Sequence, residues 1–138
     1  MRLEPLPHVY PFRFVDRTVE RAGAGGGRVA AVLTAGGRGA SGGPLSAGLV
    51  AELMAQAALL LSRAGPEPVS SGILAGLSGV AVERAPQPGD ALTVRVAPSR
   101  RMGPVVKFEA EVLDADGGRI AAGSFTIRQG TPATEATA

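Results

Sequence analysis

The sequence contains no cysteine, a single histidine and few aromatic residues. Without cysteine the chain can form neither disulfides nor thiolate-bound metal sites. One histidine, His8, excludes a multi-histidine metal centre. Aromatic residues make up 4% of the chain, so the stacking platforms that bind single-stranded nucleic acid are missing. We therefore expect no metal, no cofactor and no nucleic-acid partner.

Neither sign of charge is in large excess. Fourteen Lys and Arg residues face twelve Asp and Glu, a net charge of +2, and Lys107 is the only lysine. This weak excess suits an acidic protein partner better than nucleic acid. The one long apolar run, residues 44–61, carries Glu52 at its middle, which costs about 3 kcal/mol in lipid. The N-terminus has no apolar core of signal-peptide length, so we expect a cytoplasmic chain without membrane contact.

The remaining sequence predicts one α+β domain. At 138 residues the chain is long enough for a single core. Glycine-rich segments at 22–27 and 36–43 and turn residues at 86–90 and 114–118 predict loops. Apolar alternation predicts antiparallel strands at 28–34, 72–84, 91–96, 105–113 and 119–127. With one long helix these form a domain over 1–128, followed by a disordered tail at 129–138.

A single carboxylate stands out in the predicted helix. Residues 44–61 carry only three polar side chains, those of Ser46, Glu52 and Gln56. Glu52 and Gln56 are four residues apart and share one helix face. A helix that is apolar nearly all round is normally buried, and a buried carboxylate is costly unless it is paired or used. The spacing leaves two interpretations open, a structural ion pair or a functional group.

Other motifs carry less weight. Residues 37–42 match G-x-G-x-x-G, but no second parallel βαβ unit accompanies them, so we do not expect a dinucleotide site. Ser41 and Ser46 lack the G-x-S-x-G context of a nucleophilic serine. His8 lies in a proline-rich segment that is more typical of a packing or capping residue than of a catalytic base.

The pair Arg100 and Arg101, next to a predicted strand, has two interpretations. Such a pair is typical of a solvated sheet edge, where charge discourages edge-to-edge pairing. Its functional alternative is a contact to an anionic carrier or to a cofactor phosphate.

Four segments resemble one enzyme family in the right order. They are Leu-Pro-His-Val-Tyr-Pro-Phe-Arg-Phe-Val-Asp-Arg at 6–17, Glu-Leu-Met-Ala-Gln-Ala-Ala at 52–58, Pro-Gly-Asp at 88–90 and Arg-Arg-Met-Gly-Pro-Val-Val-Lys-Phe at 100–108. Together they resemble FabZ-type 3-hydroxyacyl-[acyl-carrier-protein] dehydratases over about residues 3–128. The resemblance implies a hotdog fold, in which an antiparallel sheet wraps around one long helix. It also implies dimers, commonly assembled as hexamers (trimers of dimers), with the active site at the dimer interface.

The chemistry implied by the resemblance needs a base, an acid and a backbone donor. In the family, a histidine in a Gly-His-Phe-Pro loop removes the proton alpha to the thioester, and a helix carboxylate of the other subunit handles the departing hydroxyl. A backbone N–H at the helix start polarises the thioester carbonyl, where the helix dipole favours negative charge. Carried over to this sequence, the carboxylate is Glu52 and the helix-start glycine is Gly48. The expected substrate contacts are Leu49, Gln56, Arg100 and Arg101, and the expected partner is acyl-carrier protein or acyl-CoA.

The histidine of that loop is missing. Residues 36–43 read Gly-Gly-Arg-Gly-Ala-Ser-Gly-Gly, so Arg38 and Ser41 are the candidates in the loop and His8 is the candidate outside it. General base catalysis contributes roughly 10²–10⁴-fold to a rate, so the loss is serious. Three functions remain open: a dehydratase-lineage protein with weak or altered activity on acyl thioesters, a thioesterase that uses Glu52, or a non-catalytic partner of a histidine-bearing subunit.

Overall fold

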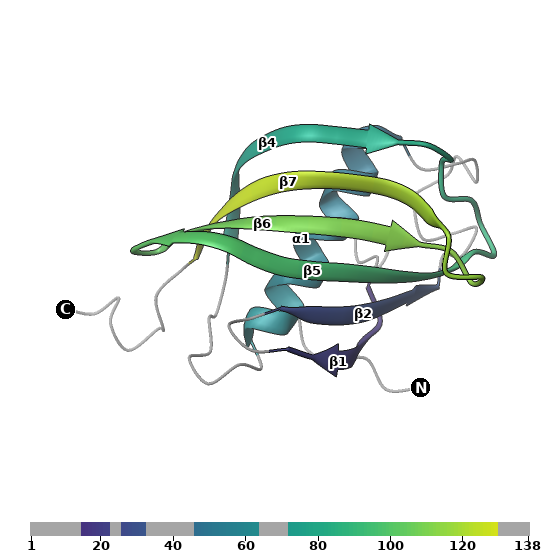
Figure 1. The fold of residues 1–138 in the computed structure, drawn as a ribbon, viewed down its shortest axis with the longest axis horizontal. Helices are drawn as coiled ribbons and strands as arrows, with labels where there is room; N and C mark the ends of the chain where they lie inside the picture. Colours follow the sequence, from purple (N-terminus) through teal and green to yellow (C-terminus); the bar gives the residue numbers. More distant parts are fainter. Residues whose placement is uncertain (1–14, 23–25, 33–45, 64–71, 130–138) are drawn as a thin grey trace.

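The computed structural model describes residues 15–22, 26–32, 46–63 and 72–129, and within these ranges a single helix packs against a six-stranded sheet (Figure 1). The strand order is β1-β2-β5-β6-β7-β4, and every neighbouring pair is antiparallel. This confirms the predicted α+β class. The elements are β1 Arg17–Arg21, β2 Gly27–Val32, α1 Ala47–Arg63, β4 Gly72–Val82, β5 Ala91–Met102, β6 Val105–Leu113 and β7 Arg119–Gln129.

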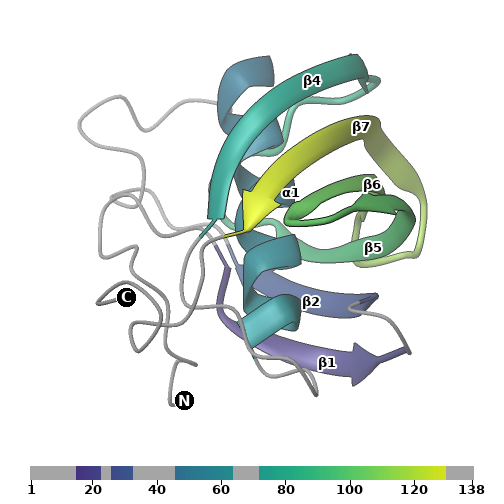
Figure 2. The same ribbon diagram turned by 90° about the vertical axis from the view of Figure 1, so that its left-hand side faces the viewer.

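The core lies between the helix and the concave face of the sheet. The sheet curves around α1 (Figure 2), and the alternating inward residues of β5, β6 and β7 are buried against it. Phe108 and Phe125, opposite each other on β6 and β7, stack with their ring centroids 5.6 Å apart. A Cβ atom at Gly123 would lie 2.9 Å from Val80 Cγ2 and 3.3 Å from Met54 Cε. The missing side chain therefore lets the helix approach β7.

Helix α1 crosses the sheet obliquely, beginning beside β4 and ending beside β1 and β2 (Figures 1 and 2). Ser46 caps the first turn, since its Oγ accepts the Leu49 N–H at 3.3 Å. At the other end, Arg21 of β1 donates from Nη1 to the Leu61 carbonyl oxygen at 2.9 Å. A cation there satisfies a carbonyl that the helix leaves unpaired.

Most predicted strands are present, with β6 at the predicted bounds. Two features differ from the prediction. The first is the exposed strand β1, which the sequence analysis left unassigned because it shows no apolar alternation. The second is the length of β5, which continues past Pro98 to Met102. The register with β6 shifts at Pro98, and β2 pairs with β5 only up to Val96, so the missing proline N–H interrupts no bond to β2.

Both predicted turns are present. The Asp114 N–H donates to the Gly118 carbonyl at 2.8 Å, and Gly117 takes a φ of 86°. In the other turn the Gln87 N–H and the Arg84 guanidinium bond the Asp90 carboxylate. These bonds hold the pKa of Asp90 below its ordinary value.

The head, the loop at 36–43 and the tail at 130–138 lie outside the described residues, as does the predicted helix start at residue 44. Among the residues described, the all-antiparallel sheet contradicts a dinucleotide-binding βαβ unit. Among the described helices, none is long and apolar enough to cross a membrane.

Candidate functional site

Glu52 lies on the second turn of α1 and is partly exposed, while Gln56, one turn later, is buried with 1% of its surface accessible. Gln56 donates from Nε2 to Glu52 Oε1 at 3.2 Å. The pairing expected from the spacing is confirmed, but the expectation of a buried carboxylate is wrong. The reason is the position of Glu52 near the open end of the helix, which leaves the carboxylate accessible while a buried amide orients it.

Among the described residues, nothing covers the start of the helix. Ser46, Ala47, Gly48 and Leu49 are all exposed, and Leu49 has 36% of its surface accessible. The first turn holds no acidic residue. The N–H groups of Ala47 and Gly48 come too early to reach a carbonyl within the helix. This end therefore presents the positive pole of the helix dipole and two N–H donors, which together favour a negatively charged oxygen.

Gly48 is not required by the packing of the described residues. A Cβ atom there would meet one described atom, Ser46 Oγ at 4.0 Å, whereas a Cβ at Gly27 would lie 2.2 Å from the Glu20 carbonyl oxygen. Glycine lowers helix stability relative to alanine, so Gly48 carries a cost that these contacts do not explain. Gly48 and Glu52 are four residues apart and share one face of α1. The space over Gly48 therefore suits the close approach of a ligand beside Glu52.

Arg100 and Arg101 lie within β5, and the sheet separates them. Arg100 is opposite Lys107 and Arg101 is opposite Val106, a buried residue on the helix side. Directly opposite residues share a face, so Arg100 is on the outer face and Arg101 is on the helix side. Although β5 lies between β2 and β6, β2 pairs with it only up to Val96. Within the described sheet, Arg100 and Arg101 therefore lie on an exposed stretch of β5 paired with β6 alone, as the interpretation as a solvated sheet edge expects. His8, Arg38 and Ser41 lie outside the described residues.

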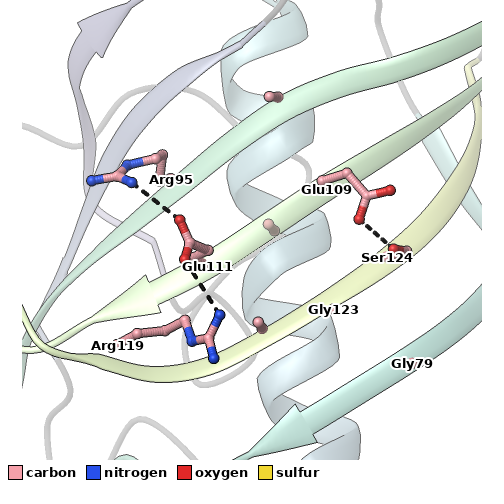
Figure 3. A pocket seen from close by; sticks show the side chains of 10 residues that line it. Gly79, Arg95, Glu109, Glu111, Arg119, Gly123 and Ser124 are labelled. Carbon is pink, nitrogen blue, oxygen red and sulfur yellow. Dashed lines mark hydrogen bonds and ion pairs between the residues drawn. The ribbon is translucent and has the colours of Figure 1, made fainter.

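A groove of about 410 Å³ runs over the outer face of the sheet, opposite the helix (Figure 3). Small residues form its floor, and Arg95, Glu111 and Arg119 line it as a connected row of charges. Arg95 contacts Glu111 at 3.1 Å, and Glu111 contacts Arg119 at 3.8 Å. None of the residues predicted from the sequence as functional lines this groove. Cross-strand charge pairing of this kind depends on register, which the sequence pattern did not predict.

Among the described residues, no group of three or more His, Cys, Asp or Glu side chains is placed to hold a metal ion.

Comparison with known proteins identifies the family, although no family model matches the chain. The chain is 32% identical over 136 residues to the 3-hydroxyacyl-[acyl-carrier-protein] dehydratase FabZ of Lactococcus lactis subsp. cremoris (strain SK11), covering 93% of this chain and 92% of that protein. The chain belongs to the FabZ family. This confirms the family resemblance and makes the chain a hotdog protein of acyl-thioester chemistry.

Solved structures agree on the fold. The dehydratase heterocomplex ApeI:P from Xenorhabdus doucetiae matches with a TM-score of 0.75 at 20% identity, covering 96% of this chain and 91% of that one. A hypothetical thioesterase with coenzyme A from Streptococcus pneumoniae TIGR4 matches with a TM-score of 0.61 at 15% identity, covering 83% of each chain. The hotdog fold expected from the sequence is therefore confirmed.

Proposed function

We propose that this chain binds 3-hydroxyacyl thioesters and supplies Glu52 as the acid of a dehydration site whose base comes from a histidine-bearing subunit. The observation that carries the proposal is Glu52 itself, an accessible carboxylate held by Gln56 on an otherwise apolar helix, one turn after an open helix start. His8 is the only histidine in the sequence and lies in the opening motif, not in the loop where the family has its base. Alone, such a chain would have weak or altered activity.

The proposed reaction is an elimination in which each group has one task. The base of the other subunit removes the proton from the α-carbon, and the electron pair forms the double bond to the β-carbon. Glu52, in its protonated form, gives its proton to the departing hydroxyl, which leaves as water. The Gly48 N–H receives the negative charge that develops on the thioester oxygen. The bond that Gln56 donates to Oε1 of Glu52 fixes the orientation of the carboxyl group.

The exposed edge of β4 supports a second subunit beside this site. In the described sheet β4 pairs with β7 alone, and its sequence, Gly-Ile-Leu-Ala-Gly-Leu-Ser-Gly-Val-Ala-Val, has no charged residue. Residues 75–79 are exposed, and Leu77 has half of its surface accessible. A long, uncharged edge strand of this kind is a template for strand pairing with another chain. Because α1 begins beside β4 (Figure 1), a subunit paired there would approach Glu52. This geometry suits a dimer, either of two copies or of this chain with a related one, and larger assemblies of such dimers.

Support for two different subunits comes from the fold neighbour that is a dehydratase heterocomplex. The test measures hydration of a crotonyl thioester by the chain alone and after mixing with histidine-bearing hotdog subunits encoded nearby. We expect little hydration alone and at least a 100-fold gain on mixing, since a general base is worth roughly 10²–10⁴-fold. Full activity of the chain alone would reject the two-subunit arrangement.

Thioester hydrolysis is the second candidate. One fold neighbour is a hypothetical thioesterase, and the open helix start with Glu52 would suffice for a carboxylate that activates water or attacks directly. Release of free thiol from acyl-CoA by the chain alone, abolished in Glu52→Gln, would favour this function over dehydration. Absence of thiol release together with activity on mixing would exclude it.

A further inference from the structure

Charges on the outer face of the sheet form a row of alternating sign across four strands. Arg95 of β5 contacts Glu111 of β6 at 3.1 Å, and Glu111 contacts Arg119 of β7 at 3.8 Å (Figure 3). Arg119 also contacts Glu83, which directly follows β4, at 2.9 Å. We call these four residues the charge row; in the strand order β5-β6-β7-β4 their signs are plus, minus, plus, minus. Since the charge row is balanced, it has no excess charge to attract a strongly charged partner.

The order of the signs makes the charge row complementary to itself. Read from its other end, the charge row runs minus, plus, minus, plus. A two-fold axis parallel to the strands, between β6 and β7, turns a second copy so that its β7 faces β6 and its β4 faces β5. Glu111 then lies beside Arg119 of the second copy, and Arg95 lies beside Glu83 of the second copy. Each of these contacts occurs twice, because a two-fold interface repeats every pair.

The neighbouring cross-strand pairs on the same face also fit this axis. Glu109 of β6 is directly opposite Ser124 of β7, and its carboxylate accepts a hydrogen bond from the Ser124 hydroxyl (Figure 3). Lys107 of β6 is directly opposite Thr126 of β7. The axis places β6 of one copy over β7 of the other, so Glu109 and Lys107 would each meet a hydroxyl group, which can both donate and accept a hydrogen bond. Neither charge would meet a like charge across the contact.

Small residues separate the charged side chains on this face. Gly79, Ala97, Ala122 and Ser124 line the groove of about 410 Å³ together with the charged residues, and all four are at least partly exposed. Two sheets that pack face to face interdigitate the side chains of their facing surfaces. The groove gives a long side chain such as Arg95 of a second copy room to lie over this floor. The shape of the face therefore permits the close approach that its charges favour.

We propose that the outer face of the sheet binds the outer face of a second copy of this chain, in a two-fold contact centred between β6 and β7. A second copy carries the reversed order of signs by symmetry, whereas any other partner would have to match that order independently. The contact is separate from the edge of β4, so it would join pairs formed at β4 into larger assemblies. It lies on the side of the sheet opposite α1 and does not rest on the proposed function.

Two single variants test the contact by exchange of charge. In Glu111→Arg the new cation would face Arg119 of an identical copy, and in Arg119→Glu the new acid would face Glu111. Sedimentation equilibrium should therefore show self-association at least about tenfold weaker in each variant than in the wild type, because like charges oppose each other across the contact. In an equimolar mixture, the new cation of one variant faces the new acid of the other, and Arg119 again faces Glu111. The mixture should associate about as strongly as the wild type.

Glu20→Arg and Arg17→Glu are the matched controls, because both residues are exposed on β1, outside the charge row. They make the same changes of charge and should leave self-association unchanged, alone or mixed. Thermal unfolding checks that each variant is folded. If a charge variant does not fold, Ala122→Gln replaces it, since a larger neutral side chain on the floor of the groove should weaken association by blocking close approach.

Three results would overturn the contact. The first is a loss of association in the β1 variants equal to that in Glu111→Arg. The second is a mixture of Glu111→Arg and Arg119→Glu that associates no better than either variant alone. The third is a wild-type chain whose mass at high protein concentration is no larger than that of Glu111→Arg.

Discussion

The two ends of helix α1 are held in different ways. The C-terminal segment, residues 57–61, is buried throughout, and Arg21 reaches from β1 to bond the Leu61 carbonyl. The N-terminal turn is exposed from Ser46 to Leu49 and is capped by its own Ser46. One end is fixed to the sheet by packing, whereas the other leaves backbone N–H groups and, one turn later, a carboxylate accessible.

The buried end of α1 therefore contributes mainly to the stability of the fold, and the exposed end carries the groups of the proposed reaction. Burial of apolar side chains is the main source of folding free energy, and α1 contributes to it from Val50 onward, whereas its first residues are exposed. The first turn can then keep a glycine, lack acidic residues and stay open without unfolding the domain. Substitutions at the open end should therefore change turnover, and substitutions at the buried end should change the free energy of unfolding.

The largest expected effect is at the open end. Glu52→Gln removes the proton donor and keeps the size of the side chain, so kcat of the complete two-subunit enzyme should fall roughly 10²–10⁴-fold. The Tm should change little, because Glu52 is partly exposed. Steady-state kinetics measure kcat, and thermal unfolding measures the Tm. The control is Glu109→Gln on the outer face, which should leave kcat unchanged; equal losses in both variants would remove Glu52 from the reaction.

The next effect is at the buried end. Leu60 is 1% exposed, and Leu60→Ala should lower the free energy of unfolding by about 2–5 kcal/mol through lost burial and a cavity. Chemical denaturation measures this loss, and kcat per folded molecule should be retained. Leu49→Ala is the matched control at the open end, where partial exposure predicts a loss below about 1 kcal/mol. A comparable loss at Leu49 would mean that the helix start is packed in solution.

A smaller effect is expected at the cap of the buried end. Arg21→Met keeps the apolar stem but removes the hydrogen bond to Leu61 and the positive charge near the helix C-terminus, so stability should fall by about 1 kcal/mol. Arg17→Met on the same strand is the control and should be neutral. No difference between the two variants in urea unfolding would show that the cap contributes nothing.

Local pattern accounts for much of this structure. Period-two alternation predicted β6 at its observed bounds, and the four-residue spacing predicted the bond between Gln56 and Glu52. Strand β1 has no such signal because it is a short, exposed edge strand, whose residues face solvent on both sides. The full length of β5 was not predicted, because a proline argues against a paired strand. Pro98 is tolerated because the register with β6 shifts there and β2 no longer pairs with β5.

The surroundings of the candidate site depend on contacts between distant segments. Strand order places the helix start beside β4, and only that order makes β4 an edge of the described sheet, near Glu52. Similarly, Arg100 and Arg101 are adjacent in sequence but lie on opposite faces of the sheet, which follows from their register with β6.

The smallest expected change in stability is at the open end of α1, where it should be opposite in sign to the change in turnover. Gly48→Ala should stabilise the chain by about 0.5 kcal/mol, because alanine favours the helix and the added Cβ has room among the described atoms. The same methyl group would occupy the space that we assign to the thioester carbonyl, so turnover should fall although stability rises. Gly123→Ala gives the contrast, since its Cβ would lie 2.9 Å from Val80 Cγ2 and should destabilise the fold by about 1–3 kcal/mol. Unfolding curves and kcat/KM for the two variants test this directly: unchanged turnover in Gly48→Ala would show that no substrate approaches the helix start.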